Sequence, residues 1–225
     1  MNDKKVIFLI GPPGAGKDTQ LNLLAEKTGF YKFVTGDEGL KYIEEHLDDA
    51  ETAQQKVNYD KGELYEPEWL LNKVQKGRTI ELLESGEKGI IFSGSPRTLY
   101  EAERLPKILG EIVGAENVVT VVMEISEEEL KRRAGERLVC SVDENHTFSK
   151  RFEEIEVGDK CPEGDGILQK KGLDGEKEVA VRIQQYNDRT MPGINYLKEH
   201  GSTVTINGEQ SVEDVHKEII KSLDL

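Results

Sequence analysis

One nine-residue stretch, Gly11-Pro12-Pro13-Gly14-Ala15-Gly16-Lys17-Asp18-Thr19, carries most of the information about this chain. It follows an apolar run, Lys5–Ile10, and opens an amphipathic stretch, Lys17–Lys27. Glycines let the backbone wrap around an anion with its N–H groups pointing inward, and the start of a helix adds the positive end of its dipole. A glycine-rich loop between a strand and a helix is typical of a phosphate-binding P-loop.

Two residues of this loop have specific expected roles. Lys17 would place a compact cation on the β- and γ-phosphates of a nucleoside triphosphate, and Thr19 would offer a hydroxyl near Mg²⁺. The strict pattern has Ser or Thr directly after the lysine, whereas here Asp18 intervenes. A turn that merely joins strand to helix would need neither the glycines nor the lysine. The residues expected at the triphosphate are Gly11, Gly14, Ala15, Gly16, Lys17, Asp18 and Thr19.

Outside the loop, short apolar runs alternate with longer amphipathic stretches. Continuous apolar runs are typical of strands buried on both faces of a parallel sheet, and the alternation places helices on both faces. We therefore expect an α/β fold of the P-loop NTPase type, with three layers and a five-stranded parallel sheet. The predicted strands are Lys5–Ile10, Tyr31–Val34, Gly89–Ser93, Val118–Ile125 and Thr203–Ile206. The predicted helices are Lys17–Lys27, Glu68–Glu84, Glu101–Leu109, Glu127–Arg137, Val179–Glu199 and Val212–Leu223.

Two stretches break this alternation. Residues 36–78 have a helical pattern but no strong strand, and residues 138–175 are rich in Gly, Asp, Glu and Lys and contain both cysteines. Both are expected to be insertions on a core domain. That core would comprise residues 1–35, 79–137 and 176–225.

The composition excludes several classes of protein. The 225 residues carry a net charge of −14 and a pI of about 4.9, so a nucleic acid or an anionic membrane would be repelled overall. No apolar run reaches the roughly 18–20 residues that span a bilayer, and Val6–Ile10 is too short for the apolar part of a signal peptide. Two cysteines are too few for a disulfide scaffold. The chain is expected to be soluble and cytoplasmic, with no nucleic-acid or membrane partner.

Several motifs together resemble those of the adenylate kinase family. The pattern G-x-P-G-x-G-K-x-T-Q at Gly11–Gln20 is similar to the family's P-loop. Thr35-Gly36-Asp37 follows the second predicted strand, as T-G-D does in the family, and Gly94-Ser95-Pro96-Arg97-Thr98 looks like its G-F-P-R-T. Arg133 and Arg137 are spaced like its R-x-x-x-R, one turn apart on a predicted helix. The resemblance covers nearly the whole chain in the same order.

This resemblance implies an activity. It implies reversible transfer of the γ-phosphate of ATP to AMP, giving two ADP, in an Mg²⁺-dependent reaction carried out by a monomer. Residues 36–78 would cover the monophosphate, and residues 138–175 would form a lid over the triphosphate. Arginines suit such chemistry because their planar fork binds phosphate oxygens in pairs and their charge stabilises the developing transition state.

The same resemblance implies roles for individual residues. Lys17 would hold the transferring phosphoryl group, and Arg97 would grip the α-phosphate of AMP. Three further arginines would close on the phosphates, namely Arg133 and Arg137 at ATP and Arg182 at AMP. The other residues expected at the nucleotides are Gly208 near the adenine of ATP, and Thr35, Gly36, Lys41, Leu64, Tyr65, Gly94 and Glu101 around AMP.

Two departures from the family pattern concern metal and phosphate. Ser93 ends the third strand where the family has an aspartate that orients Mg²⁺-bound water. We hypothesise that Asp18 supplies this carboxylate; the alternative is that Asp18 only favours the helix N-terminus. The family's arginine after T-G-D is missing. Lys41 would replace that arginine as a point charge. The alternative is that Lys41 is an ordinary solvated lysine.

A third departure concerns the acceptor base. Glu101 stands where the family has a glutamine that reads adenine. A carboxylate can only accept hydrogen bonds, so it suits the amino group of adenine but cannot donate to N1, whereas guanine offers two adjacent donors. Thr35 favours AMP. AMP is therefore the expected acceptor, with GMP, UMP or CMP as alternatives, and Glu101 is otherwise an ordinary helix residue.

Cys140 and Cys161 both lie in the second insertion, where some relatives carry a four-cysteine zinc site. Here Asp143, His146 and Asp165 would have to complete the ligand set, at spacings that are unusual for zinc. A metal-free insertion is therefore expected, and structural zinc is not.

Two other classes of function compete with this interpretation. A GTPase-type switch is disfavoured, because the sequence contains no N-K-x-D segment to read guanine. An inactive nucleotide-binding module stays open because Ser93, Lys41 and Glu101 depart from the family pattern. Conversion of ATP plus AMP into ADP would distinguish these alternatives.

Overall fold

A central parallel sheet organises the structure, a computed structural model that describes residues 4–61, 63–143, 146–150, 153–170 and 176–225. Its strand order is β2-β3-β1-β4-β8, and every pair within it is parallel. The predicted α/β fold with five parallel strands is therefore confirmed. The strands are β1 (Lys5–Ile10), β2 (Tyr31–Val34), β3 (Gly89–Ser93), β4 (Val118–Glu124) and β8 (Ser202–Asn207).

The central strand β1 is buried on both faces, as its continuous apolar sequence predicts. Val6, Phe8 and Ile10 face one hydrophobic cluster, whereas Ile7 and Leu9 face a second one on the other side of the sheet. All five side chains are at most 3% exposed. Successive side chains of a strand point to opposite faces, so this one strand contributes to both cores.

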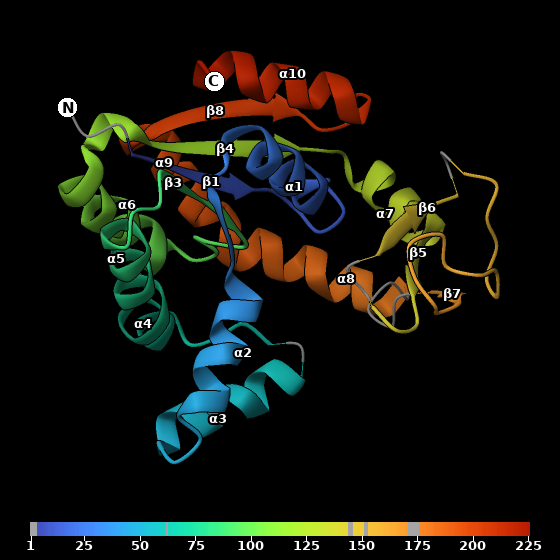
Figure 1. Ribbon diagram of the computed structural model, residues 1–225, viewed down its shortest axis with the longest axis horizontal. Coiled ribbons are helices and arrows are strands. Elements are labelled where there is room, and N and C mark those ends of the chain that lie inside the picture. The colour runs from blue at the N-terminus through green and yellow to red at the C-terminus, as the bar shows by residue number, and fades with distance from the viewer. Residues whose placement is uncertain (1–3, 62, 144–145, 151–152, 171–175) are drawn as a thin grey trace.

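Helices cover the two faces of the sheet (Figure 1). One face carries α1 (Lys17–Thr28) and α10 (Val212–Leu223), whereas the other carries α6 (Leu99–Val113) and α9 (Met191–His200). Side-chain oxygens satisfy the first backbone N–H groups of several helices, as Thr98 does for α6. A short 3₁₀ turn, η2 (Ala115–Asn117), leads into β4. Among the described residues, no helix has both the length and the apolar character to cross a membrane.

The first predicted insertion is helical. It contains α2 (Thr35–Glu45) and α3 (Ala50–Asp60), which project away from the sheet in Figure 1. The predicted helix Glu68–Glu84 is present but not uniform, because it consists of α4 (Pro67–Trp69), the π-helical turn η1 (Leu70–Gln75) and α5 (Lys76–Glu84). The N–H of Lys76 donates to the carbonyl of Leu71, five residues back, which defines the wide turn.

The second predicted insertion contains a small antiparallel sheet of its own, with the order β6-β5-β7. Its strands are β5 (Arg137–Cys140), β6 (Thr147–Ser149) and β7 (Leu168–Gln169), which were not predicted. The preceding helix α7 (Glu127–Glu136) ends before Arg137, so the placement of Arg137 on a helix was wrong. Leu138 and Phe148 pack with both cysteines into a separate small core.

A long helical segment follows this sheet and leads back to the core. It runs through α8 (Glu176–Gln185), a second π-helical turn η3 (Tyr186–Thr190) and α9. The predicted helix Val179–Glu199 matches this segment, but again the sequence did not reveal the wide turn. Both π-helical turns lie beside the cavity described next.

Candidate functional site

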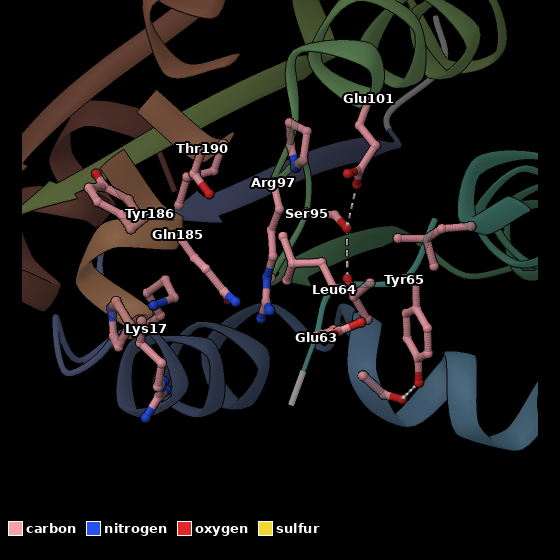
Figure 2. A pocket seen from close by; sticks show the side chains of 18 of the residues that line it. Lys17, Glu63, Leu64, Tyr65, Ser95, Arg97, Glu101, Gln185, Tyr186 and Thr190 are labelled. Carbon is pink, nitrogen blue, oxygen red and sulfur yellow. Dashed lines mark hydrogen bonds between the residues drawn. The ribbon is translucent and has the colours of Figure 1, made fainter. Parts of the chain in front are cut away.

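A cavity of about 510 Å³ opens where the carboxyl ends of the parallel strands meet the first insertion and α8. Ligands of open α/β sheets bind at this edge, and the volume suits small organic ligands. In Figure 2, Arg97 lies between Lys17 on one side and Leu64 and Tyr65 on the other. The lining residues that the sequence singled out are Gly11, Lys17, Thr35, Gly36, Leu64, Tyr65, Gly94, Arg97, Glu101 and Arg182.

The P-loop is held in a conformation that requires glycine at several places. A Cβ atom on Gly11 would lie 2.5 Å from the backbone oxygen of Met123 in β4. Gly14 and Gly16 have φ angles of 84° and 89°, in a region that favours glycine. Helix α1 then begins at Lys17, so its first N–H groups lie at the loop. The loop therefore has the backbone geometry of an anion site.

Positive charge converges on this loop. The Lys17 ammonium donates to the carbonyl oxygens of Gly11 and Pro12, at 2.9 Å each. Burial lowers the pKa of Lys17 to about 8; Asp18 opposes this shift, and the charges of Arg97, Arg182 and Arg137 add to it. The three arginines thus act on Lys17 from different elements. Such a concentration of cations suits a ligand with several negative charges.

Arg133 ties the P-loop to the loop after β8. Its guanidinium donates to the carbonyl of Gly14 at 3.3 Å and to that of Gly208 at 2.7 Å, while its Nε bonds to Glu129 at 2.7 Å. Hydrogen bonds and charge from Arg132 and Arg133 lower the pKa of Glu129 to about 2. Gly208 must be small, because an added Cβ would lie 2.9 Å from Ile125. Gly14, Arg133 and Gly208 therefore form one continuous wall.

The far side of the cavity is built around Tyr65. Its hydroxyl donates to the carbonyl of Gly36 at 3.1 Å, and its ring packs so closely on α2 that a Cβ on Gly39 would lie 2.4 Å from it. Leu64 and Leu70 add apolar surface, and Thr35 adds a hydroxyl. This side is less charged than the P-loop side, which suits a flat, largely apolar group such as a nucleobase.

Some predicted site residues lie elsewhere. Lys41 is exposed on α2 and does not line the cavity. Asp18 and Thr19 lie on the first turn of α1, where the Ser93 hydroxyl donates to Asp18 at 3.0 Å. Arg137 acts on Lys17 from β5, outside the cavity lining. Ala15, which is buried, and Gly16 belong to the loop itself.

Sequence reasoning missed several residues of the wall. Ser95 lies within the Gly94–Thr98 motif, at a position where the resembling family has phenylalanine, and that departure was the available signal. Tyr186 and Thr190 also line the cavity. They lie in the π-helical turn η3, which the sequence did not predict. The remaining lining residues that were missed include Tyr59, Lys61, Glu63, Val181 and Gln185.

A separate cluster of possible metal ligands lies in the small antiparallel sheet. The ligand atoms of Cys140, His146 and Cys161 all lie within 4.8 Å of one another. The Cys161 sulfur is 3.7 Å from His146 Nδ1, and the other ring nitrogen of His146 is 3.6 Å from Asp143. Backbone N–H groups bond to both sulfurs, as that of Val142 does to Cys140 at 3.5 Å.

Known proteins are similar to this chain over nearly its whole length. A family model described as adenylate kinase matches residues 9–202. The adenylate kinase of Methanosarcina barkeri is 33% identical over 213 residues, which cover 95% of each chain. The adenylate kinase of Methanosarcina mazei is 35% identical over 214 residues, again 95% of each, and that of Methanothrix thermoacetophila is 33% identical over 219 residues. The chain therefore belongs to the adenylate kinase family of phosphotransferases.

Proposed function

We propose that this chain transfers the γ-phosphate of ATP to AMP and forms two molecules of ADP. The observation that carries the proposal is the arrangement of one cavity, with a P-loop and Lys17 at one end, Arg97 in the middle and a base-sized apolar wall at Tyr65. ATP would bind at the P-loop end, and AMP would bind between Arg97 and Tyr65. The two phosphate chains would then meet along the row of cations.

The mechanism follows from this placement. Phosphoryl transfer needs in-line positioning and charge stabilisation more than covalent help from the protein. Lys17 and the P-loop amides would hold the transferring group, and Arg97 would hold the attacking phosphate. Arg182 lines the same cavity, whereas Arg133 donates to Gly14 of the P-loop and Arg137 acts on Lys17 from β5. Together they would neutralise charge that spreads over the transferring oxygens.

We also propose a division of labour among the parts of the chain. Residues 1–35, 79–137 and 176–225 would form the core, residues 36–78 the AMP-binding insertion, and residues 138–175 a lid over ATP. Tyr65 and Thr35 support the second assignment, because both line the cavity from the first insertion and its junction with β2. Closure of the lid would exclude water, which protects ATP from hydrolysis. The proposed enzyme works as a cytoplasmic monomer on small nucleotides.

Magnesium is part of the proposal. It would neutralise charge on the ATP phosphates, and its ligands would come from oxygen atoms and water. Thr19 offers a hydroxyl on the first turn of α1. The hydrogen bond of 3.0 Å between Ser93 and Asp18 supports the hypothesis that Asp18 supplies the carboxylate missing from β3, because it places the two side chains together.

The cluster in the small sheet favours a structural zinc ion over the metal-free insertion expected from sequence. Two thiols and an imidazole are ligands that zinc prefers. Asp143 lies against the second ring nitrogen of His146, which is the usual outer partner of a ligating histidine. Cys140, His146 and Cys161 would supply three of the four ligands that a structural zinc ion takes. A bound zinc would stabilise the small sheet and take no part in transfer.

The first prediction concerns the acceptor phosphate. Arg97→Ala should lower kcat/KM for ATP plus AMP by about 100- to 1,000-fold, because a charge-assisted contact to phosphate is lost. The measurement is a coupled assay of ADP formation. Arg104→Ala is the matched control, because Arg104 is exposed on α6 and pairs with Glu103. Equal losses in both variants would contradict the assignment, and hydrolysis that ignores the acceptor would favour a GTPase-type switch.

The second prediction concerns the charge of Lys17 without nucleotide. Its pKa is about 8 in the folded chain, compared with 10.5 for an unperturbed lysine, so the unfolded chain binds more protons between these two values. Stability of the native chain should therefore rise with pH over that range. Lys17→Met should be more stable by about 1–3 kcal/mol at pH 7, with the difference closing as the pH approaches that of the unperturbed lysine. Urea unfolding of both chains measures this, and a difference independent of pH would refute it.

The third prediction concerns magnesium. Asp18→Gly should raise the Mg²⁺ concentration needed for half-maximal rate by about 10-fold or more, because an oriented carboxylate is lost. Adding Ser93→Asp to this variant should restore most of the affinity, since it returns a carboxylate to the same place. Rates are titrated against Mg²⁺ at saturating nucleotide. An unchanged Mg²⁺ optimum in Asp18→Gly removes the hypothesis.

The fourth prediction concerns zinc. Purified protein should contain about one zinc ion per chain, and a strong chelator should lower its Tm. His146→Gln should lose the metal, whereas His200→Gln should keep it, because His200 is exposed on α9, far along the chain from the cluster. Metal analysis and thermal unfolding supply both readouts. A wild-type chain that contains no zinc, and whose Tm does not change when the chelator is added, would support the metal-free interpretation.

A further inference from the structure

A small group of charged and polar side chains joins α2 to its neighbours outside the cavity. It consists of Tyr31, Glu38 and Arg78, which we call the α2 clamp. Tyr31 begins β2, Glu38 lies on the first turn of α2, and Arg78 lies on α5. In Figure 1, α2 leads from the end of β2 away from the sheet. The α2 clamp therefore lies where the first insertion leaves the core.

The carboxylate of Glu38 is the centre of the α2 clamp. Its side chain is only 11% exposed, and a carboxylate in such a place needs partners. The Tyr31 hydroxyl donates to Glu38 Oε1 at 2.5 Å, and Arg78 Nε lies 3.4 Å from Glu38 Oε2. The Arg78 guanidinium also donates to the Tyr31 oxygen at 3.5 Å and lies 5.7 Å from the centre of its ring. Burial and the bond to Glu38 raise the pKa of Tyr31, so the hydroxyl keeps its proton.

The turn that carries Glu38 also forms part of the AMP side of the cavity. Thr35 and Gly36, the first two residues of α2, line the cavity. The N-cap residue Val34 provides no side-chain hydrogen bond, so this turn can donate backbone N–H groups to an anion. Since Lys41 lies outside the cavity lining, the binding of AMP by α2 depends on how this first turn is oriented.

Helix α5 contacts the opposite wall of the same side. Gln75, three residues before Arg78, is fully buried at the end of η1, and its Nε2 donates to Ser95 Oγ at 2.6 Å. Ser95 lines the cavity beside Arg97. The start of α5 is therefore tied to the Arg97 segment through Gln75 and to α2 through Arg78.

The contact between Arg78 and Glu38 is not fully formed. The Nε N–H of Arg78 is buried and has no hydrogen-bond acceptor among the residues that the structure describes. Its distance of 3.4 Å from Glu38 allows an ion pair, but the groups are not aligned for a hydrogen bond. A buried donor without an acceptor is unfavourable. A small rotation of α2 that aligned Glu38 with this N–H would therefore be stabilising.

We propose that Arg78 is a positioning residue for the acceptor nucleotide, which acts through Glu38 to hold the first turn of α2 in the orientation that binds AMP. The proposal rests on AMP being the acceptor. Arg78 does not touch the nucleotide. Its hydrogen bond to Glu38 forms fully when AMP draws the first turn of α2 toward Arg97, so part of the affinity for AMP comes from this bond.

The test compares AMP with ATP in variants of the α2 clamp. Arg78→Gln and Glu38→Gln should each raise KM and Kd for AMP by about 10-fold, because each removes the charge-assisted bond. The KM for ATP should stay within about 2-fold of the wild-type value, since the P-loop is not affected. The double variant should bind AMP no more weakly than either single variant, because both substitutions remove one shared contact. Steady-state rates and titration calorimetry with AMP supply the two readouts.

Glu81→Gln is the matched control. Glu81 is the other carboxylate partner of Arg78, at 2.8 Å from its Nη1, but its side chain is 67% exposed and does not contact α2 through any interaction described above. This variant should keep the wild-type KM for AMP. Tyr31→Phe removes one hydroxyl from the α2 clamp and should cause a smaller rise in the KM for AMP. Thermal unfolding identifies the variants that fold, and Tyr31→Phe provides the test if Arg78→Gln does not.

Two results would overturn the proposal. A purely structural role of the α2 clamp would lower Tm and would either change the KM values for ATP and AMP equally or leave both unchanged. Losses of AMP affinity that multiply in the double variant would show that Arg78 and Glu38 act independently. A wild-type chain that forms no ADP from ATP and AMP would instead refute the proposed function.

Discussion

The parallel pairing of β1 with β3 and β4 is the constraint on which the rest of the structure depends. β1 is buried on both faces and lies between β3 and β4, so the chain continues into the P-loop at the carboxyl edge of the sheet. The backbone of Gly11 passes so close to Met123 in β4 that no side chain fits between them. The phosphate loop is therefore positioned by strand packing before any ligand binds, and preorganised amides of this kind cost no rearrangement during reaction.

The two ends of the cavity use opposite kinds of polarity. At the phosphate end, cations from separate elements act on Lys17 and lower its pKa, and Asp18 opposes this effect. At the Tyr65 end, neutral and acidic side chains form hydrogen bonds with one another inside the protein. Cationic side chains therefore concentrate at the P-loop end of the cavity, whereas hydrogen bonds between protein side chains concentrate at the Tyr65 end.

Sequence patterns predicted the sheet well, because a strand buried on both faces leaves a continuous apolar run. The small sheet of the second insertion was not predicted, because its strands are two to four residues long and show no clear alternation of apolar and polar residues. The P-loop, Arg97 and Glu101 could be found by motif, but not the contacts of Glu101. These depend on Gln75, whose inward orientation follows from a wide turn that has no sequence signature, and on Ser95, which is informative only once its neighbours are known.

The wide turn η1 also has an evolutionary consequence. A π-helical turn holds one residue more than an ordinary turn, so it can arise or vanish through the gain or loss of a single codon. Loss of one residue between Leu70 and Gln75 would rotate the amide away from Ser95 without touching the P-loop or Arg97. Such a change would remove the hydrogen bonds of Gln75 to Ser95 and Glu101, and an alignment without a gap here would pair inward-facing residues with outward-facing ones.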